Sequence, residues 1–182
     1  MQRIAIDMDE VTADTMAHYL QRYNAEFNLN LTKEHFLGKR VFEVIDRAHV
    51  SRSREYFQSS DFFVDIPVMP FSQEVIRELM SAYEVFITTA AMDVPNSFSA
   101  KFRWLQRHFP FIPVSNVVFC GDKSIVAADY MIDDDVRHLR RFSGEGILFT
   151  APHNVHETEF RRVDDWQQIR EMFLSPERSP AC

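Results

Sequence analysis

The first strand of the chain is short, apolar and followed at once by acidic residues. Ile4, Ala5 and Ile6 form an uninterrupted apolar run, which is typical of a strand buried on both faces. Asp7 and Asp9 come directly after this run. In an open α/β sheet the carboxyl ends of the strands border the ligand crevice, so acids placed there face a site and avoid the core. The opening stretch therefore predicts an α/β fold with a polar site at the end of its first strand.

Four more apolar runs have the character of strands, and helical patterns separate them. These runs cover residues 83–89, 117–120, 130–132 and 146–150. Strands that alternate with helices predict a Rossmann-like parallel sheet with right-handed crossovers and helices on both faces.

Polar residues follow four of the five expected strands. A single Asp-x-Asp pair after a strand is also typical of a solvated turn, but repetition at four strand ends favours a shared site. The residues at these ends are Asp7 with Asp9, Thr88 with Thr89, Asp122 with Lys123, and Asp133 with Asp134.

The segment after the first strand matches a strand of the main sheet poorly. Residues 15–66 show short helical patterns, so we expect a small helical cap inserted there, with the α/β core formed by residues 1–14 and 67–175. The total length of 182 residues fits one domain with such an insert. Residues 176–182 are polar, contain proline and are expected to form a flexible tail.

Composition limits the partners and the compartment. The formal net charge of −7 disfavours a nucleic acid polymer, so we expect small anions as ligands. Cys120 and Cys182 lie far apart and indicate no disulfide framework, which suits the cytoplasm. No apolar run approaches the roughly 20 residues that a membrane span requires, so no membrane partner is expected. The oligomeric state stays open, a homodimer included.

Residues 7–14, Asp-Met-Asp-Glu-Val-Thr-Ala-Asp, resemble motif I of the haloacid dehalogenase-like (HAD) phosphohydrolases. They are most similar to the 5'(3')-deoxyribonucleotidases, whose version reads Asp-Met-Asp-Gly-Val-Leu-Ala-Asp, and depart from it at Glu10 and Thr12. The resemblance runs from Arg3 to about Thr150 and includes matching segments at 62–67, 85–91, 101–105 and 121–134. It implies a HAD-like core with a small cap and a phosphatase activity.

Phosphoryl transfer to water requires a nucleophile, a proton donor for the leaving oxygen, and positive charge near the phosphate. Asp7 is the candidate nucleophile, because a carboxylate can form an aspartyl-phosphate that divides the reaction into two easier steps. Asp9 would serve as general acid and then as general base. The resemblance implies phosphate contacts from Thr89, Lys123 and Lys101. It also places Ala90 where that family has serine, so one phosphate hydroxyl is missing.

A cluster of carboxylates without Cys or His ligand spacing predicts a hard cation with oxygen ligands, and Mg²⁺ is the usual one beside a phosphate. The resemblance implies that Asp7, the main-chain carbonyl of Asp9 and Asp134 bind the metal, with Asp133 as an additional candidate. The run of acids from Asp133 to Asp135 is also typical of the N-terminal cap of a helix.

The predicted function is a Mg²⁺-dependent phosphomonoesterase that acts on 5'- or 3'-(deoxy)nucleotide monophosphates. One alternative is a phosphatase for another small phosphoester, such as a sugar phosphate. A second is a catalytically weak module that binds nucleotide or phosphate, which Glu10 and Ala90 favour. The position after Asp14 is Thr15 where the similar family has Phe, so another aromatic residue must enclose the base; the candidates are Phe36, Phe42 and Phe63.

Overall fold

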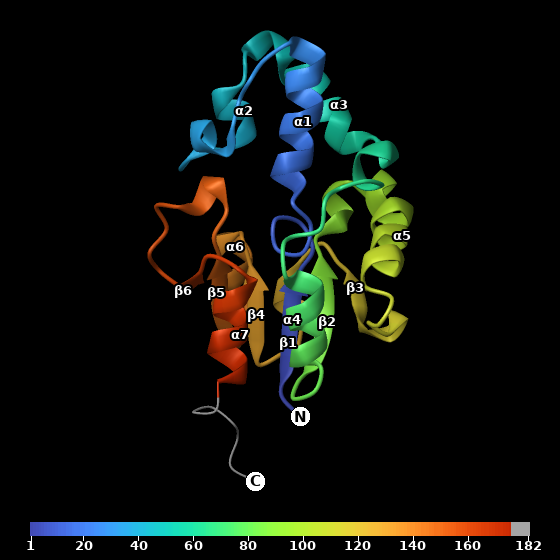
Figure 1. Ribbon diagram of the computed structural model, residues 1–182, viewed down its shortest axis with the longest axis vertical. Helices are drawn as coiled ribbons and strands as arrows, with labels where there is room; N and C mark the ends of the chain where they lie inside the picture. Colours follow the sequence, from blue (N-terminus) through green and yellow to red (C-terminus); the bar gives the residue numbers. More distant parts are fainter. Residues whose placement is uncertain (176–182) are drawn as a thin grey trace.

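The computed structural model describes residues 1–175 as a six-stranded parallel sheet with helices packed on it and a helical unit above one end (Figure 1). The strand order is β3-β2-β1-β4-β5-β6. The strands are β1 (Arg3–Asp7), β2 (Glu84–Thr89), β3 (Val117–Phe119), β4 (Tyr130–Asp133), β5 (Glu145–Phe149) and β6 (Arg161–Val163). The expected parallel α/β class is confirmed. The tail expected at residues 176–182, with Cys182, lies outside the described residues.

The first strand lies at the centre of the sheet, where its apolar residues are covered on both faces. β1 pairs with β2 and β4, so that Ile6 lies opposite Ile87 and Ile132. Ile4 and Ile6 belong to the larger core cluster, which includes residues of α4, α5 and α7. Ala5 points to the other face and packs in the cluster that includes α6. The sequence analysis missed β6, whose three residues form no apolar run.

Within residues 1–175, seven α-helices accompany the sheet. They are α1 (Thr15–Phe27), α2 (Val41–Val44), α3 (Val50–Gln58), α4 (Ser72–Leu79), α5 (Phe98–His108), α6 (Val136–Leu139) and α7 (Trp166–Leu174). None of the helices within residues 1–175 is long and apolar enough to cross a membrane.

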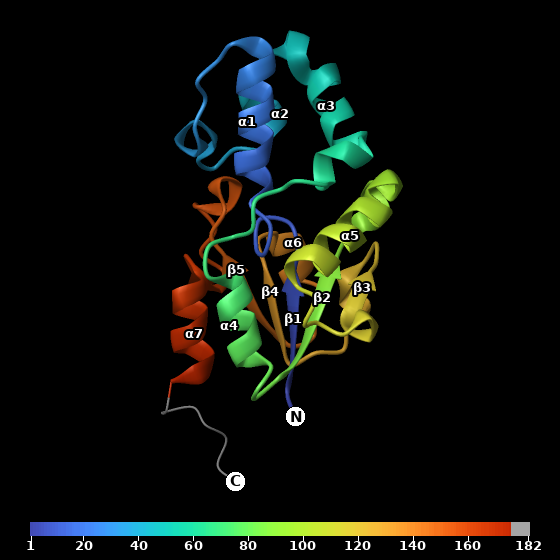
Figure 2. The same cartoon turned by 45° about the vertical axis from the view of Figure 1, so that its right-hand side comes forward.

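Helices α1, α2 and α3 stand beyond the carboxyl end of the sheet, as Figures 1 and 2 show from two sides. We call residues 15–66 the cap and propose these boundaries for it. Its interior is aromatic: Tyr19 stacks on Tyr23 and on Phe57, and its hydroxyl lies 2.8 Å from Ser53 Oγ. Phe36 is fully buried in the core. Tyr19, Tyr23 and Phe36 belong to the same hydrophobic cluster as Ile4 and Ile6, so the packing of the cap continues into that of the core.

Two chain segments that run side by side join the cap to the core. Ala13 forms an antiparallel bridge with Val68, and the amide of Asp14 donates to Pro67 O at 2.8 Å. Asp14 also begins α1, since its side chain accepts a hydrogen bond from the amide of Ala17 at 3.0 Å. One acidic residue therefore fixes both the connection and the direction of the first cap helix.

The loop after β1 is held from the far end of the chain. Trp166, fully buried at the start of α7, donates its indole N–H to Val11 O at 2.8 Å. The same loop contains Glu10 at a φ of +59°, in the left-handed region that favours glycine. The Glu10 carboxylate accepts from the amide of Met16 at 2.5 Å, which gives one more N–H of α1 an acceptor.

We expect Trp166→Phe to lower the free energy of unfolding by about 1–3 kcal/mol, because the buried carbonyl of Val11 loses its donor. Urea denaturation measures this change. Gln167→Ala, an exposed change on the same helix, is the control and should stay within about 0.5 kcal/mol of the wild type. Equal effects of the two substitutions would contradict the role given to the indole.

Candidate active site

Three carboxylates meet where β1 and β4 end. Asp7 is the last residue of β1, Asp133 is the last residue of β4, and Asp134 follows it. The two strands are adjacent and parallel, so their carboxyl ends coincide. One carboxylate oxygen from each acid lies within 4.8 Å of the others. This cluster is a candidate metal site.

Lys123 supplies the positive charge beneath this cluster. Its ammonium group donates to Asp7 Oδ1 and, at 2.5 Å, to Asp133 Oδ2, and its side chain is 1% exposed. Burial by itself lowers the pKa of Lys123, but the two carboxylates outweigh it and raise this pKa above its ordinary value. Lys123 therefore stays charged and bridges two of the three acids.

Burial is the main cause of the raised pKa values of Asp7 and Asp134. It raises the pKa of Asp7 to about 7, with Lys123 opposing the shift and Asp133 adding to it. It also places the pKa of Asp134 well above its ordinary value, with further contributions from Asp133 and Asp7. Within residues 1–175, Asp134 forms no ion pair with a lysine or an arginine. Among the described residues, it is therefore the acid of the cluster that no lysine or arginine pairs with.

A second group of polar residues lies on the other side of β1. Lys101, on α5 and 5% exposed, donates to Asp9 Oδ2 and to Thr89 Oγ1, the latter at 3.2 Å. Thr15 Oγ1 donates to the other oxygen of Asp9 at 3.2 Å. Thr88, by contrast, bonds to the main-chain carbonyl of Ile6 inside the sheet. Thus Thr89 faces the site and Thr88 does not.

The structure brings together the seven residues expected at the site, although it leaves their chemical roles as proposals. They are Asp7, Asp9, Thr89, Lys101, Lys123, Asp133 and Asp134. Asp122, which also follows a strand, instead pairs with Arg141 at 2.5 Å and has a 41% exposed side chain. Of the pair at this strand end, Lys123 therefore joins the site and Asp122 lies outside it.

The acidic residues at the end of β4, Asp133 to Asp135, have two different environments. Asp133 and Asp134 face the site, whereas Asp135 caps α6 by accepting from the amide of Arg137 at 3.0 Å. Burial by itself raises the pKa of Asp135, but hydrogen bonds from Arg137 lower it below its ordinary value. Asp135 also pairs with Arg40 of the cap at 3.2 Å. The capping interpretation of the run is thus confirmed for Asp135, and metal binding by Asp133 and Asp134 stays a prediction.

A cavity of about 480 Å³ lies between these acids and the cap. The core contributes Asp7, Asp9, Asp133 and Asp134, and the cap contributes Arg40, Val41, Phe42, Phe57 and Phe63. A neighbouring, mainly apolar pocket of about 160 Å³ shares several of these residues; its lining includes Glu10, Met16, Tyr19, Arg40, Val41, Phe57 and His153. The acids therefore open onto a space large enough for a small phosphoester, with an apolar recess beside it.

Two of the three aromatic residues expected to enclose a base line the larger cavity. Phe42 and Phe63 do so, whereas Phe36 is fully buried and does not. Phe57, which belongs to both pockets, was not expected. Phe57 lies in a short helical pattern, and periodicity does not show which aromatic residue faces a cavity.

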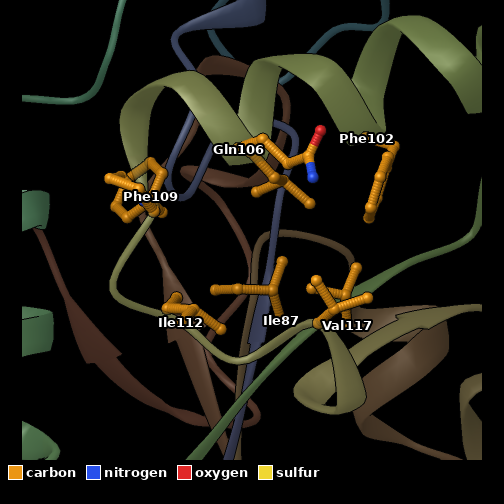
Figure 3. A pocket seen from close by; sticks show the side chains of 9 residues that line it. Ile87, Phe102, Gln106, Phe109, Ile112 and Val117 are labelled. Carbon is orange, nitrogen blue, oxygen red and sulfur yellow. The ribbon is translucent and has the colours of Figure 1, made fainter.

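Another pocket lies away from these acids. Figure 3 shows it between α5 and the strands β2 and β3, with Ile87, Phe102 and Phe109 among its apolar walls. Gln106 is the polar side chain in its lining. Because it contains no charged group, this pocket does not suit a phosphate.

The sequence analysis also missed His153 and Asn154, which follow β5. Asn154 Nδ2 donates to Asp134 O at 2.8 Å, and His153 Nε2 lies 3.7 Å from Asp134 Oδ2. The rule that polar residues after parallel strands face the site applies here too and could have found them.

The chain matches known families over nearly its whole length. The family model described as "5' nucleotidase, deoxy (Pyrimidine), cytosolic type C protein" matches residues 1–178. A Staphylococcus epidermidis protein with the provisional name 5'(3')-deoxyribonucleotidase is 44% identical, covering 97% of this chain and 98% of its own. The 5'(3')-deoxyribonucleotidase of Bacillus subtilis is 41% identical, covering 94% of this chain and 98% of its own.

Solved structures agree with the fold. A HAD-type hydrolase of Bacillus subtilis, solved with bound magnesium, matches with a TM-score of 0.59 at 12% identity. The match covers 96% of this chain and 99% of that one. Taken with the family match, these findings show that the chain belongs to the cytosolic type C deoxy-5'-nucleotidase family of the HAD hydrolases.

Proposed function

We propose that this phosphoric monoester hydrolase releases phosphate from 5'- or 3'-deoxynucleotide monophosphates, with Mg²⁺ and an aspartyl-phosphate intermediate. The observation that carries the proposal is the cluster of Asp7, Asp133 and Asp134 around Lys123, at a cavity that residues of the cap also line. The names of the relatives support a deoxynucleotide substrate. The net charge of −7 supports a small ester over a nucleic acid polymer, and the cytoplasm stays our proposed compartment.

The acids of the cluster fit Mg²⁺. Three carboxylate oxygens within 4.8 Å of one another offer hard ligands, and this cluster of described residues consists of aspartates alone. Asp134, which pairs with no lysine or arginine among the described residues, would also be stabilised in its charged form by a cation. Asp7 and Asp134, with Asp133 and the main-chain carbonyl of Asp9 as further candidates, would hold the ion. When bound, Mg²⁺ would draw charge from the phosphate oxygens and reduce their repulsion by the carboxylates.

The nucleophile in this proposal is Asp7. As the last residue of a central strand it is held by the rigid sheet, so its carboxylate can be aimed for in-line attack. A bond forms between an Asp7 oxygen and phosphorus, while the bond to the ester oxygen breaks and that oxygen takes a proton from Asp9. Asp9 then removes a proton from water, which attacks phosphorus, frees Asp7 and yields inorganic phosphate.

Two lysines would provide positive charge for the phosphate. Lys101 bonds to both Asp9 and Thr89, so an incoming phosphate can compete with Asp9 for its ammonium group. This exchange would release Asp9 for proton transfer. Lys123 remains bound to Asp7 and Asp133 and supplies fixed positive charge beside the nucleophile.

The apolar recess beside the acids suits a nucleobase. Tyr19, Phe57 and Val41 contribute to its lining, and aromatic side chains stack favourably on flat rings. Phe57 and Val41 also line the cavity above the acids, so one substrate can span both spaces. A phosphate at Asp7 with a base near Phe57 therefore describes the proposed binding mode.

Activity should require the metal. We expect EDTA to abolish deoxynucleotide hydrolysis, because it removes the metal. Asp134→Asn should lower kcat/KM by more than about 100-fold, since the loss of a direct metal ligand should exceed the 10- to 100-fold effect of losing a contact that supports one. Asp122→Asn, a surface acid after another strand, is the control and should change activity by less than about twofold. Full activity in EDTA would refute the proposed metal dependence.

Substitution of Asp7 and substitution of Asp9 should have different effects on the reaction. Asp7→Asn should prevent phosphoenzyme formation, whereas Asp9→Asn should still bind substrate and lose about 10²–10⁴-fold in rate on deoxynucleotides. That loss should be smallest with p-nitrophenyl phosphate, whose leaving group departs without a proton. Multiple turnovers in ¹⁸O-labelled water provide the direct check, because a covalent mechanism places label in the Asp7 carboxylate. Turnover without such label would mean that water attacks the phosphorus directly.

Changes in the cap should alter substrate choice more than chemistry. We expect Phe57→Ala or Phe42→Ala to raise KM for deoxynucleotides and to leave p-nitrophenyl phosphate turnover within about tenfold, or ~1.4 kcal/mol. Phe36→Ala is the matched control, because this buried ring should cost about 3–5 kcal/mol of stability without a change in selectivity. Equal losses of Phe57→Ala on both substrates would assign Phe57 to the packing of the cap alone.

A further inference from the structure

Asp134 is held by the turn that follows β5 and not by its own strand. β4 ends at Asp133, so the main chain of Asp134 lies outside the sheet. Its carbonyl accepts a hydrogen bond of 2.8 Å from Asn154 Nδ2, which also donates to Phe149 O at 2.8 Å. One amide group thus connects the end of β5 to the residue after β4.

Asn154 is itself fixed in place. It is 2% exposed, and its Oδ1 accepts from the amide of Ala151 at 3.1 Å and from Arg162 Nη1 at 2.9 Å. Arg162 also donates from Nη2 to the carbonyl of Asn154 at 2.9 Å. Both ends of the Asn154 amide are in use, so a residue lacking either the donor or the acceptor could not replace it. Because the turn is anchored on β6, it offers a rigid support to Asp134.

His153, the residue before Asn154, approaches the carboxylate of Asp134. Its Nε2 is buried, forms no hydrogen bond among the described residues, and lies 3.7 Å from Asp134 Oδ2. A buried ring nitrogen without a partner costs about 1–3 kcal/mol, so such groups seldom stay unpaired. A displacement of less than about 1 Å would bring the two atoms to hydrogen-bond distance. Asp134 is the acceptor within reach of that nitrogen.

We propose that His153 and Asn154 are positioning residues for Asp134, a role that rests on the metal site of the proposed function. Asn154 fixes the main chain of Asp134, and His153 donates to one carboxylate oxygen so that the other faces the cation. Asp7 and Asp133 obtain their orientation from Lys123 instead. Contacts that orient metal ligands typically contribute 10- to 100-fold to metal affinity.

The test measures metal binding without turnover. Mn²⁺, which prefers the same oxygen ligands as Mg²⁺, is titrated into the protein and followed by the loss of the free-ion EPR signal. We expect His153→Phe to raise the Mn²⁺ dissociation constant about tenfold, because the ring keeps its bulk and loses its donor. His153→Gln, which keeps a donor, should stay within about threefold of the wild type.

The matched control is His18→Phe. His18 lies in the cap and is the other histidine of the described chain whose buried Nε2 has no hydrogen-bond partner, so its replacement should leave Mn²⁺ binding unchanged. Asn154→Asp tests the second contact, since it keeps the size of the side chain and removes the Nδ2 donor. It should weaken Mn²⁺ binding as well. If His153→Phe does not fold, His153→Ala takes its place in the comparison.

The outcomes separate this proposal from the proposed function. If His153→Phe leaves the Mn²⁺ dissociation constant unchanged, the inference is overturned. A lower melting temperature of this variant in EDTA, without metal, would then show that His153 has a purely structural role. Equal weakening in His153→Gln and His153→Phe would do the same, because the donor would then be irrelevant. Failure of the wild type itself to bind Mn²⁺ would instead reject the metal site on which the proposed function depends.

Discussion

The candidate site depends on the buried ion pairs that Lys123 makes with Asp7 and Asp133. Carboxylates at the ends of two adjacent strands repel one another, and burial strengthens that repulsion because the surrounding dielectric constant is low. Lys123, almost fully buried, lies where it neutralises both. Removal of one partner of a buried pair typically costs 3–5 kcal/mol, so this lysine is expected to be needed for folding as well as for phosphate binding.

The central part of the fold could be predicted because burial leaves a clear pattern in sequence. The apolar residues before Asp7 indicated a strand covered on both faces, and the structure places it between β2 and β4. β6 could not be found in this way, since Arg161 and Arg162 break any apolar run and only Val163 is buried. Yet Arg162 anchors the turn that holds Asp134. The element that sequence reasoning missed is therefore the one that supports a missed part of the site.

Sequence identified the kinds of residue at the site better than their directions. Asp134 and Asp135 are adjacent and chemically equal, but the backbone turns one toward the acids and the other toward the start of α6. Phe36 and Phe57 both follow helical patterns, and only their place in the cap decides that Phe57 meets a cavity. At position 10 this chain has Glu where the similar family has Gly. The φ of +59° at Glu10 explains the glycine of that family, because the loop requires a left-handed backbone conformation there.

The charges of the site also explain why a divalent cation belongs in the proposal. Its principal groups are four carboxylates and two lysines, namely Asp7, Asp9, Asp133, Asp134, Lys101 and Lys123. When all are ionised, four negative charges face two positive ones, which leaves two negative charges before a phosphate arrives. Burial is the main cause of the raised pKa values of Asp7 and Asp134, and the neighbouring carboxylates add to both shifts. A phosphate dianion would increase the excess of negative charge, and a cation beside Asp134 would reduce it. In the proposed mechanism, the orientation of Asp134 by the turn after β5 would therefore affect how the site accepts a phosphate.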